Sequence, residues 1–220
     1  MKKFVRFASV MTAAVVLATA SQAWAASVVN GNFETGPFGV TPTGFTVSPG
    51  GEIVAVQASA YVPCCGVTGT AAELANHFAA FGGGEQTNIS TLDQIIRTAE
   101  GDRLHISFDF GALGGGFQTL FASAYEADGN RLLGSFQVTR SADNNLSTTF
   151  GRYSFDAIAA SSITRLSFSV DGPSAGVDGI LDNIAVAVPE PASWALMIAG
   201  FGVVGGALRR RRPARVIALA

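Results

Sequence analysis

Apolar and polar residues alternate along much of this chain, and a period of two predicts β-strands. In residues 103–110 the leucine, isoleucine and phenylalanine side chains share one face, whereas His105, Ser107 and Asp109 share the other. Similar runs recur between glycine-rich turns. They lie at residues 52–57, 77–81, 92–98, 132–139, 148–156, 166–170 and 184–188.

The number and spacing of these runs predict the fold class. About nine or ten short strands with glycine-rich turns are typical of an all-β protein with two packed antiparallel sheets. The Asp-Gly-Asn sequence at 128–130 separates a run ending at Tyr125 from the run at 132–139, which predicts a hairpin. One helical turn is expected at 70–76. We therefore expect an antiparallel sandwich over residues 26–188.

The first 25 residues have the pattern of a signal peptide. Lys2, Lys3 and Arg6 supply the positive start, an apolar stretch follows at 10–18, and the Ala-Trp-Ala sequence at 23–25 offers small residues to signal peptidase. An uncleaved N-terminal anchor is the alternative. The pattern predicts cleavage after residue 25 and export of the domain through the inner membrane.

A second apolar segment lies near the C-terminus. Residues 192–208 carry no charge, and as a helix they would be about 25 Å long, the lower limit for crossing a membrane. The four arginines at 209–212 would stay on the cytoplasmic side. This pattern predicts one C-terminal transmembrane helix, with the domain outside and residues 213–220 as a cytoplasmic tail. A buried core helix is the alternative.

Short motifs frame this apolar segment. It is preceded by Pro189, Glu190 and Pro191 and followed by Arg209, Arg210, Arg211 and Arg212. Together, over residues 189–212, these features resemble the PEP-CTERM sorting signal of Gram-negative bacteria. Prolines on both sides would keep Glu190 extended and accessible to an enzyme.

The resemblance implies a route for the protein. An exosortase, which is an integral-membrane cysteine transpeptidase, would recognise the Pro-Glu-Pro element. The helix would be a temporary membrane anchor and the arginines its stop. The domain would first be held in the periplasm and then be released to the cell surface or the extracellular space.

Charge is distributed unevenly along the chain. Residues 27–188 hold 15 acidic side chains, 6 arginines and no lysine, so the formal net charge of this part is about −9. Such a domain is repelled by the phosphates of a nucleic acid. We therefore expect no nucleic-acid partner.

Two short motifs mark the ends of the domain. The Asn-Gly-Asn-Phe-Glu sequence at 30–34 and the Leu-Asp-Asn-Ile sequence at 181–184 resemble the opening and closing motifs of galactose-binding-like jelly rolls, which include carbohydrate-binding modules. The resemblance implies a jelly-roll sandwich and, in several such modules, a structural calcium ion where the two ends meet.

The alternation around Asp182 adds an independent argument for a special environment. Asp182 shares strand parity with Ile180 and Ile184, which places a carboxylate on an apolar face. A buried carboxylate must be paired, hydrogen-bonded or bound to a metal. Calcium, with Glu34 as the second ligand, is one interpretation; a turn cap or backbone hydrogen bonds are the other. Both stay open.

The residues needed for known catalytic motifs are scarce. The two histidines, His77 and His105, lie on separate predicted strands, and no G-x-S-x-G, H-E-x-x-H or cysteine–histidine signature is present. A glycosidase would need two carboxylates that face one sugar cleft. We expect a protein that is not an enzyme, with a glycan-active hydrolase as the less favoured alternative.

Cys64 and Cys65 are adjacent and are the chain's two cysteines. In an oxidising compartment they favour a vicinal disulfide, a strained ring that Pro63 and Gly66 would accommodate. Two free thiols and an intermolecular bridge are the alternatives.

Sugar recognition usually relies on exposed aromatic rings. Both tryptophans lie in the two terminal signals, and most phenylalanines alternate with polar residues as core residues do. The candidate ligand-binding residues are therefore Tyr61, His105 and Asp109, and an ordinary solvated surface is the alternative for each.

Together these predictions describe an exported, exosortase-sorted, non-catalytic protein of the cell envelope or extracellular matrix. The resemblance to exosortase substrates implies an extracellular polysaccharide as partner. A purely structural envelope or biofilm protein without glycan affinity is the alternative.

Overall fold

The protein is described by a computed structural model that covers residues 26–48, 53–65, 67–82, 90–114, 116–128, 130–142, 150–172, 177–188 and 191–210. The predicted signal peptide, Pro189, Glu190, Arg211, Arg212 and the predicted cytoplasmic tail lie outside the described residues.

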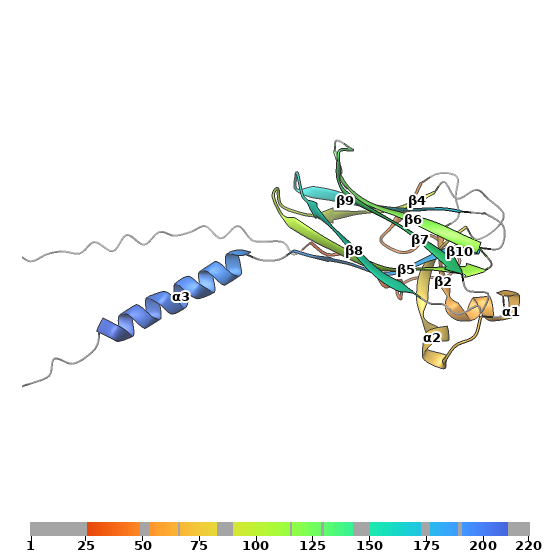
Figure 1. The fold of residues 1–220 in the computed structure, drawn as a ribbon, viewed down its shortest axis with the longest axis horizontal. Helices are drawn as coiled ribbons and strands as arrows, with labels where there is room; N and C mark the ends of the chain where they lie inside the picture. The colour runs from red at the N-terminus through yellow and green to blue at the C-terminus, as the bar shows by residue number, and fades with distance from the viewer. Residues whose placement is uncertain are drawn as a thin grey trace, which may run out of the picture.

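Two five-stranded sheets pack face to face (Figure 1). The first sheet has the strand order β1-β4-β9-β6-β7 and the second has the order β2-β3-β10-β5-β8, and every described pair is antiparallel. The predicted antiparallel sandwich is confirmed. The strands are β1 (Thr46–Val47), β2 (Ile53–Gln57), β3 (His77–Phe81), β4 (Thr91–Arg97), β5 (Arg103–Gly114), β6 (Gly116–Glu126), β7 (Leu132–Ala142), β8 (Gly151–Ile158), β9 (Ile163–Asp171) and β10 (Val177–Ala187).

The predicted hairpin joins β6 to β7. These strands pair in antiparallel register from Gly116 opposite Ala142 to Tyr125 opposite Leu132. The strand that sequence reasoning missed is β1, which has two residues and is too short to show a period.

The main core lies between the two sheets. Its central ring is Phe108 of β5, which is fully buried. Four other rings have their centroids 5.6–6.4 Å from it: Phe136, Tyr153, Phe155 and Phe168. The apolar face predicted for residues 103–110 therefore builds this core.

Short helices cover part of the outer face of the second sheet (Figure 1). They are the 3-10 helix η1 (Ala58–Ala60), α1 (Tyr61–Cys65) and α2 (Ala71–Ala75). The turn predicted at 70–76 is α2, which begins with a capping box between Thr70 and Glu73. A second apolar cluster around Phe78 fills the space under these helices. No described helix packs on the outer face of the first sheet.

The C-terminal segment forms the helix α3 (Pro191–Arg210). Among the residues that the structure describes, no helix combines the length and the apolar character that a membrane span requires. Membrane crossing by this segment stays a prediction.

Candidate functional site

An aromatic row lies on the outer face of the first sheet. Along β6 the even-numbered residues from Gln118 to Ala124 point into the core, so the odd-numbered ones point outward. The row consists of Phe117, Phe121 and Tyr125. Phe117 is 52% exposed and Phe121 is 37% exposed. Because successive rings are four residues apart, they are spaced about 13 Å along the strand.

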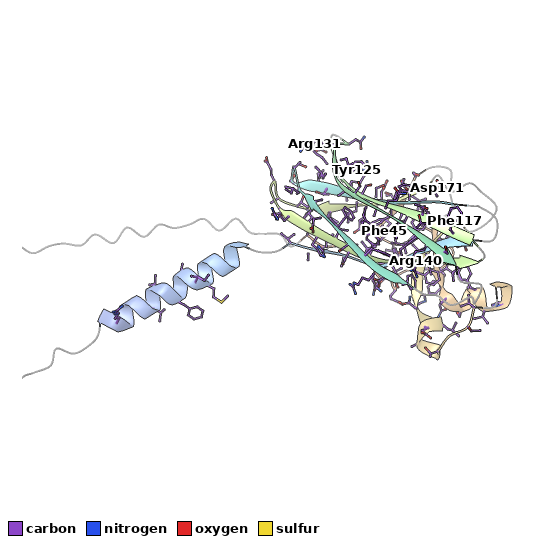
Figure 2. All side chains as sticks on the ribbon, in the orientation of Figure 1. Phe45, Phe117, Tyr125, Arg131, Arg140 and Asp171 are labelled. Atoms are coloured by element: carbon purple, nitrogen blue, oxygen red, sulfur yellow. The ribbon has the colours of Figure 1, made fainter. Side chains whose placement is uncertain are left out.

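Tyr125 is held in place by a cation. The guanidinium of Arg165 lies 4.7 Å from the centre of the tyrosine ring. The same guanidinium lies 3.4 Å from Asp93 Oδ2 and donates a hydrogen bond of 2.7 Å to Asn130. The cation–π contact fixes one end of the row, and Figure 2 shows Tyr125 and Phe117 well separated along the sheet.

Small polar side chains flank the aromatic row on both neighbouring strands. The register places Thr139 and Gln137 of β7 opposite Thr119 and Phe121, and the two threonine hydroxyls lie 2.9 Å apart. On the other side the register places Ser167, Ser169 and Asp171 of β9 beside β6. Exposed rings on a floor of hydroxyl and amide groups suit a sugar chain, whose C–H faces stack on rings and whose hydroxyls form hydrogen bonds.

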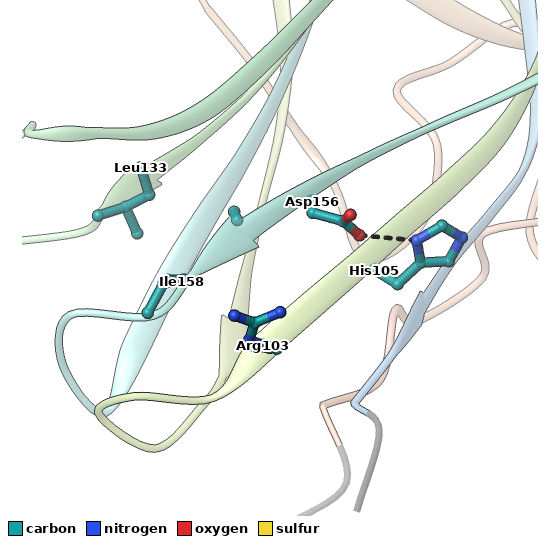
Figure 3. Close-up of a pocket in the computed structure, with 6 residues that line it drawn as sticks. Arg103, His105, Leu133, Asp156 and Ile158 are labelled. Carbon is teal, nitrogen blue, oxygen red and sulfur yellow. Dashed lines mark hydrogen bonds and ion pairs between the residues drawn. The ribbon is translucent and has the colours of Figure 1, made fainter.

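His105 lines a separate hollow, which we call the His105 hollow (Figure 3). Its volume is about 480 Å³, and its lining residues are Arg103, His105, Leu133, Asp156, Ala157 and Ile158. The His105 Nδ1 atom lies 2.8 Å from Asp156 Oδ1. The predicted ligand-binding residue His105 is therefore accessible beside a pocket.

Asp109 does not join His105. The two residues are four positions apart on β5, which corresponds to about 13 Å. Asp109 Oδ2 instead accepts a hydrogen bond of 2.9 Å from Asn183, and Arg152 Nε lies 3.9 Å from Oδ1.

Tyr61 lies at the other end of the second sheet. Its hydroxyl donates a hydrogen bond of 2.8 Å to Asp178, and its ring packs against Phe78 in the second apolar cluster. Burial raises the pKa of Tyr61 and also that of Asp178. The hydroxyl is thus engaged in an internal bond, and the three predicted ligand-binding residues are not brought together.

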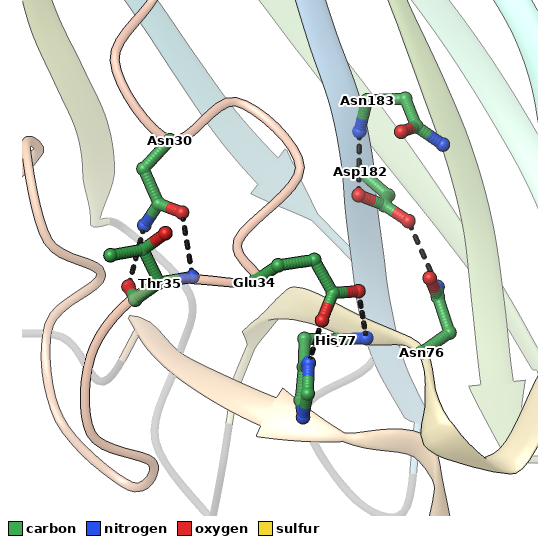
Figure 4. A network of polar contacts seen from close by, with 7 residues as sticks. All are labelled: Asn30, Glu34, Thr35, Asn76, His77, Asp182 and Asn183. Atoms are coloured by element: carbon green, nitrogen blue, oxygen red, sulfur yellow. Dashed lines mark hydrogen bonds and ion pairs between the residues drawn. The ribbon is translucent and has the colours of Figure 1, made fainter.

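Glu34 and Asp182 belong to one polar network (Figure 4). Asp182 is 2% exposed and accepts hydrogen bonds from the Asn76 side chain (2.9 Å) and the Asn183 backbone (2.6 Å). Glu34 pairs with the His77 ring and also accepts a hydrogen bond from the His77 backbone.

Burial raises the pKa of Asp182 to about 6. Its hydrogen bonds act against this rise, and the carboxylates of Asp109 and Glu34 add to it. Within the described parts of the chain, no three histidine, cysteine or acidic residues converge as a metal site. Calcium binding stays a prediction.

The sequence argument for Asp182 was right about burial and wrong about the face. The pairing of β10 with β5 is irregular between Asp182 and Ala185, and Asn183 has a φ of 51°. This bulge reverses the alternation, since it inserts one residue into the strand. Ile180 consequently packs in the outer cluster and Ile184 in the main core. Asp182 shares the outer face with Ile180 and does not share a face with Ile184.

The backbone of Cys64 and Cys65 forms the end of α1. Their side chains and Gly66 lie outside the described part of the structure. The vicinal disulfide stays a prediction.

Comparison with known proteins decides the nature of the C-terminal segment. Residues 187–212 match the family described as the PEP-CTERM protein-sorting motif. The tail is a PEP-CTERM motif. Its match begins two residues before the predicted start at Pro189, at the last residue of β10. No curated protein matches the chain.

Solved structures similar to this chain include carbohydrate-binding modules. A structure described as TmCBM61 in complex with β-1,4-galactotriose is 17% identical over 74% of this chain and 99% of its own, with a TM-score of 0.49. The CBM22-1 xylan-binding domain from Paenibacillus barcinonensis Xyn10C is 13% identical over 73% of this chain and 93% of its own, with a TM-score of 0.44.

A third similar structure belongs to a longer protein. It is the arabinose-bound MgGH51 α-L-arabinofuranosidase, which is 12% identical over 76% of this chain and 27% of its own, with a TM-score of 0.51. At this identity the likeness shows the fold alone. With the observed sheet order, it confirms the predicted jelly-roll sandwich.

Sequence reasoning missed Phe117 and Phe121 as surface residues. It assigned most phenylalanines to the core because they alternate with polar residues. The distinguishing signal is the composition of the opposite face of β6, where Leu120, Ala122 and Ala124 are apolar and buried. Only one face of β6 needs to be buried, so the face that also carries threonine and serine is the outer one.

Proposed function

We propose that the protein is an exported, non-catalytic glycan-binding protein of the cell surface or extracellular matrix, and that the aromatic row of β6 is its binding face. The single observation that supports this most strongly is the exposure of Phe117 and Phe121 beside threonine and serine hydroxyls on a sheet face that no described helix covers. Exposed apolar side chains that gather on one face with polar neighbours often mark a binding site.

The dimensions of the row favour an extended ligand. Phe117 and Tyr125 are eight residues apart on one strand, so the row is about 26 Å long. Its immediate neighbours on β7 and β9 are mostly neutral hydroxyl and amide side chains. A linear, neutral extracellular polysaccharide that contacts several rings at once fits this surface.

The tail accounts for delivery. The PEP-CTERM motif supports a secreted protein that is sorted at the membrane. We propose that signal peptidase removes residues 1–25, that residues 192–208 anchor the chain transiently in the membrane, and that an exosortase releases the domain from the periplasmic side to the surface. Phe117, Phe121 and the exopolysaccharide they contact would then meet outside the cell.

Removing the rings should weaken glycan binding without unfolding the protein. Phe117→Ala and Phe121→Ala should each lower affinity for the cell's own polysaccharide about tenfold, because each loses roughly 1–2 kcal/mol of stacking and apolar contact. Affinity electrophoresis of the secreted domain in gels that contain the polysaccharide measures this loss. Phe38→Ala is the matched control, since Phe38 is also 52% exposed but stacks on His77 beside the second sheet.

The alternative role would give a different result. If the wild-type domain shows no retardation in any glycan tested, or if Phe38→Ala weakens binding as much as Phe117→Ala, the aromatic row is not the binding face. A purely structural envelope protein without glycan affinity would then be the better account.

We further propose a structural calcium ion between the two ends of the domain. Asp182 and Glu34 would be ligands, and Asp109 lies opposite Asp182 across the β5–β10 pair, where its Oδ1 atom is buried and has no hydrogen-bond partner among the described residues. The neighbouring carboxylates of Asp109 and Glu34 add to the raised pKa of Asp182, and a divalent cation would favour its charged form. The calcium ion would have a structural role, because it would join the segment at 30–34 to β10.

The pH dependence of stability tests this arrangement. Asp182 has a folded pKa of about 6 against an ordinary 3.8, so without calcium it favours the folded state below about pH 4 and loses this contribution as pH rises through 6. The free energy of unfolding should fall by at most about 3 kcal/mol over that window. Urea unfolding in EDTA measures it, and Asp182→Asn should remove the fall.

Calcium should reverse the effect. At pH 7 millimolar calcium should raise the melting temperature of the wild type, and it should do so much less for Asp182→Asn. An identical melting temperature in EDTA and in calcium would refute the proposed calcium site.

A further inference from the structure

The sorting motif begins where the folded domain ends. β10 continues to Ala187, and Val188 still packs against the main core. Glu190 follows three residues after Ala187, so the two Cα atoms are at most about 11 Å apart in an extended chain. Any enzyme that encloses Glu190 therefore works directly beside the sandwich.

The end of β10 is held on both sides. On one side Ala187 pairs with His105, and His105 pairs with Asp156 on the next strand. On the other side Ile184 donates a backbone hydrogen bond of 2.8 Å to Gly31. Neighbouring strands are about 4.8 Å apart, so Asp156 lies about 10 Å from Ala187. Because β10 is hydrogen-bonded on both sides, its end is fixed, and the motif that follows starts close to this surface.

The His105 hollow lies beside this exit, because Ala187 pairs with His105, one of its lining residues. Ile158 at its rim is 56% exposed, and Leu133 forms part of its wall. Arg103 is exposed and has no hydrogen-bond or ion-pair partner among the described residues, although acidic side chains predominate in the domain. Figure 3 shows Arg103, Ile158 and Leu133 around the same hollow. Arginine is enriched in protein interfaces and among the residues that contribute most to binding, and here it lies beside the exposed side chain of Ile158.

We propose that the His105 hollow is a docking surface for the periplasmic face of the exosortase. The enzyme would read the Pro-Glu-Pro element and at the same time contact the rim at Arg103 and Ile158, because the short connection leaves no room to avoid the domain. The folded sandwich thereby contributes to substrate recognition, in addition to the tail. This inference depends on exosortase processing as proposed above.

Release kinetics with and without a spacer test the docking surface. Ile158→Asp and Arg103→Glu should each slow release of the domain about tenfold at the native spacing. Ile95→Asp is the matched control, since Ile95 is a similarly exposed isoleucine on the outer face of the first sheet.

The same substitutions are repeated in a chain with ten glycine and serine residues between Val188 and Pro189. In the spacer chain the exosortase can bind the Pro-Glu-Pro element without contacting the domain, so neither substitution should change the rate of release. Pulse-chase fractionation measures release, and thermal melting of each secreted domain verifies folding.

Two results would overturn the proposal. The first is wild-type release of Ile158→Asp and Arg103→Glu at the native spacing. The second is slow release of these variants in the spacer chain as well, which would indicate a defect unrelated to docking. Glu190→Ala tests exosortase processing separately from docking. It should block release of both the native chain and the spacer chain. Normal release of this variant would refute exosortase processing, and with it the docking proposal.

Discussion

Replacing Glu190 by alanine should leave the full-length chain in the membrane fraction, with release reduced at least about a hundredfold. Glu190 is the one charged residue of the Pro-Glu-Pro element, and we expect the flanking prolines to keep it extended and accessible to an enzyme. A buried charged contact in an enzyme cleft is commonly worth about 3 kcal/mol or more, which corresponds to such a factor. Immunoblots of fractionated cells measure the effect.

Glu73→Gln is the control for this substitution. It also neutralises a glutamate, but it lies in α2 and glutamine can still complete the capping box. It should be released as the wild type is. Equal release of Glu190→Ala and Glu73→Gln would contradict recognition of the Pro-Glu-Pro element.

The second large effect should come from the core. Phe108→Ala should lower the free energy of unfolding by about 3–5 kcal/mol, because Phe108 is fully buried and four rings surround it. This is a large part of the stability of a typical domain. Urea unfolding of the isolated domain, followed by tyrosine fluorescence, measures the loss.

Phe117→Ala provides the comparison on the neighbouring sheet. It removes the same side chain from a position that is about half exposed, so it should cost less than about 1 kcal/mol. The two variants should therefore separate stability from glycan binding. A loss of less than 1 kcal/mol for Phe108→Ala would mean that the two sheets do not pack as described.

Strands could be predicted where apolar and polar residues alternate without interruption. Residues 103–110 alternate without interruption, and the prediction for this segment agrees with β5 because one face must be buried between the sheets. The same rule failed at Asn183, where a left-handed residue and a bulge reverse the faces. A single-residue insertion of this kind has no periodic signal.

The candidate sites were harder to predict for a related reason. Tyr61 carries the amphipathic ring expected at a sugar site, but long-range packing places it against Phe78 with its hydroxyl on Asp178. Phe117 has a side chain of a type that usually lies in the core, but it is exposed. Whether a ring faces solvent depends on which sheet faces remain uncovered, and this is set by contacts distant in the sequence.

The sorting motif was predictable because its chemistry is local. The spacing of Pro189, Glu190 and Pro191 before an apolar helix and an arginine run can be read without tertiary structure, and the prediction agrees with the family match at 187–212. The predicted strand at 184–188 also agrees with β10, which continues to Ala187, the first residue of this match.

The mass of the released protein is the most direct test of this account. Intact-mass spectrometry of the protein collected outside cells should show a chain that begins at Ala26 and lacks the apolar segment and the arginines, and cells without the exosortase should retain a longer form that includes them. An external protein that still carries Arg209–Arg212, or an identical mass with and without the exosortase, would contradict it.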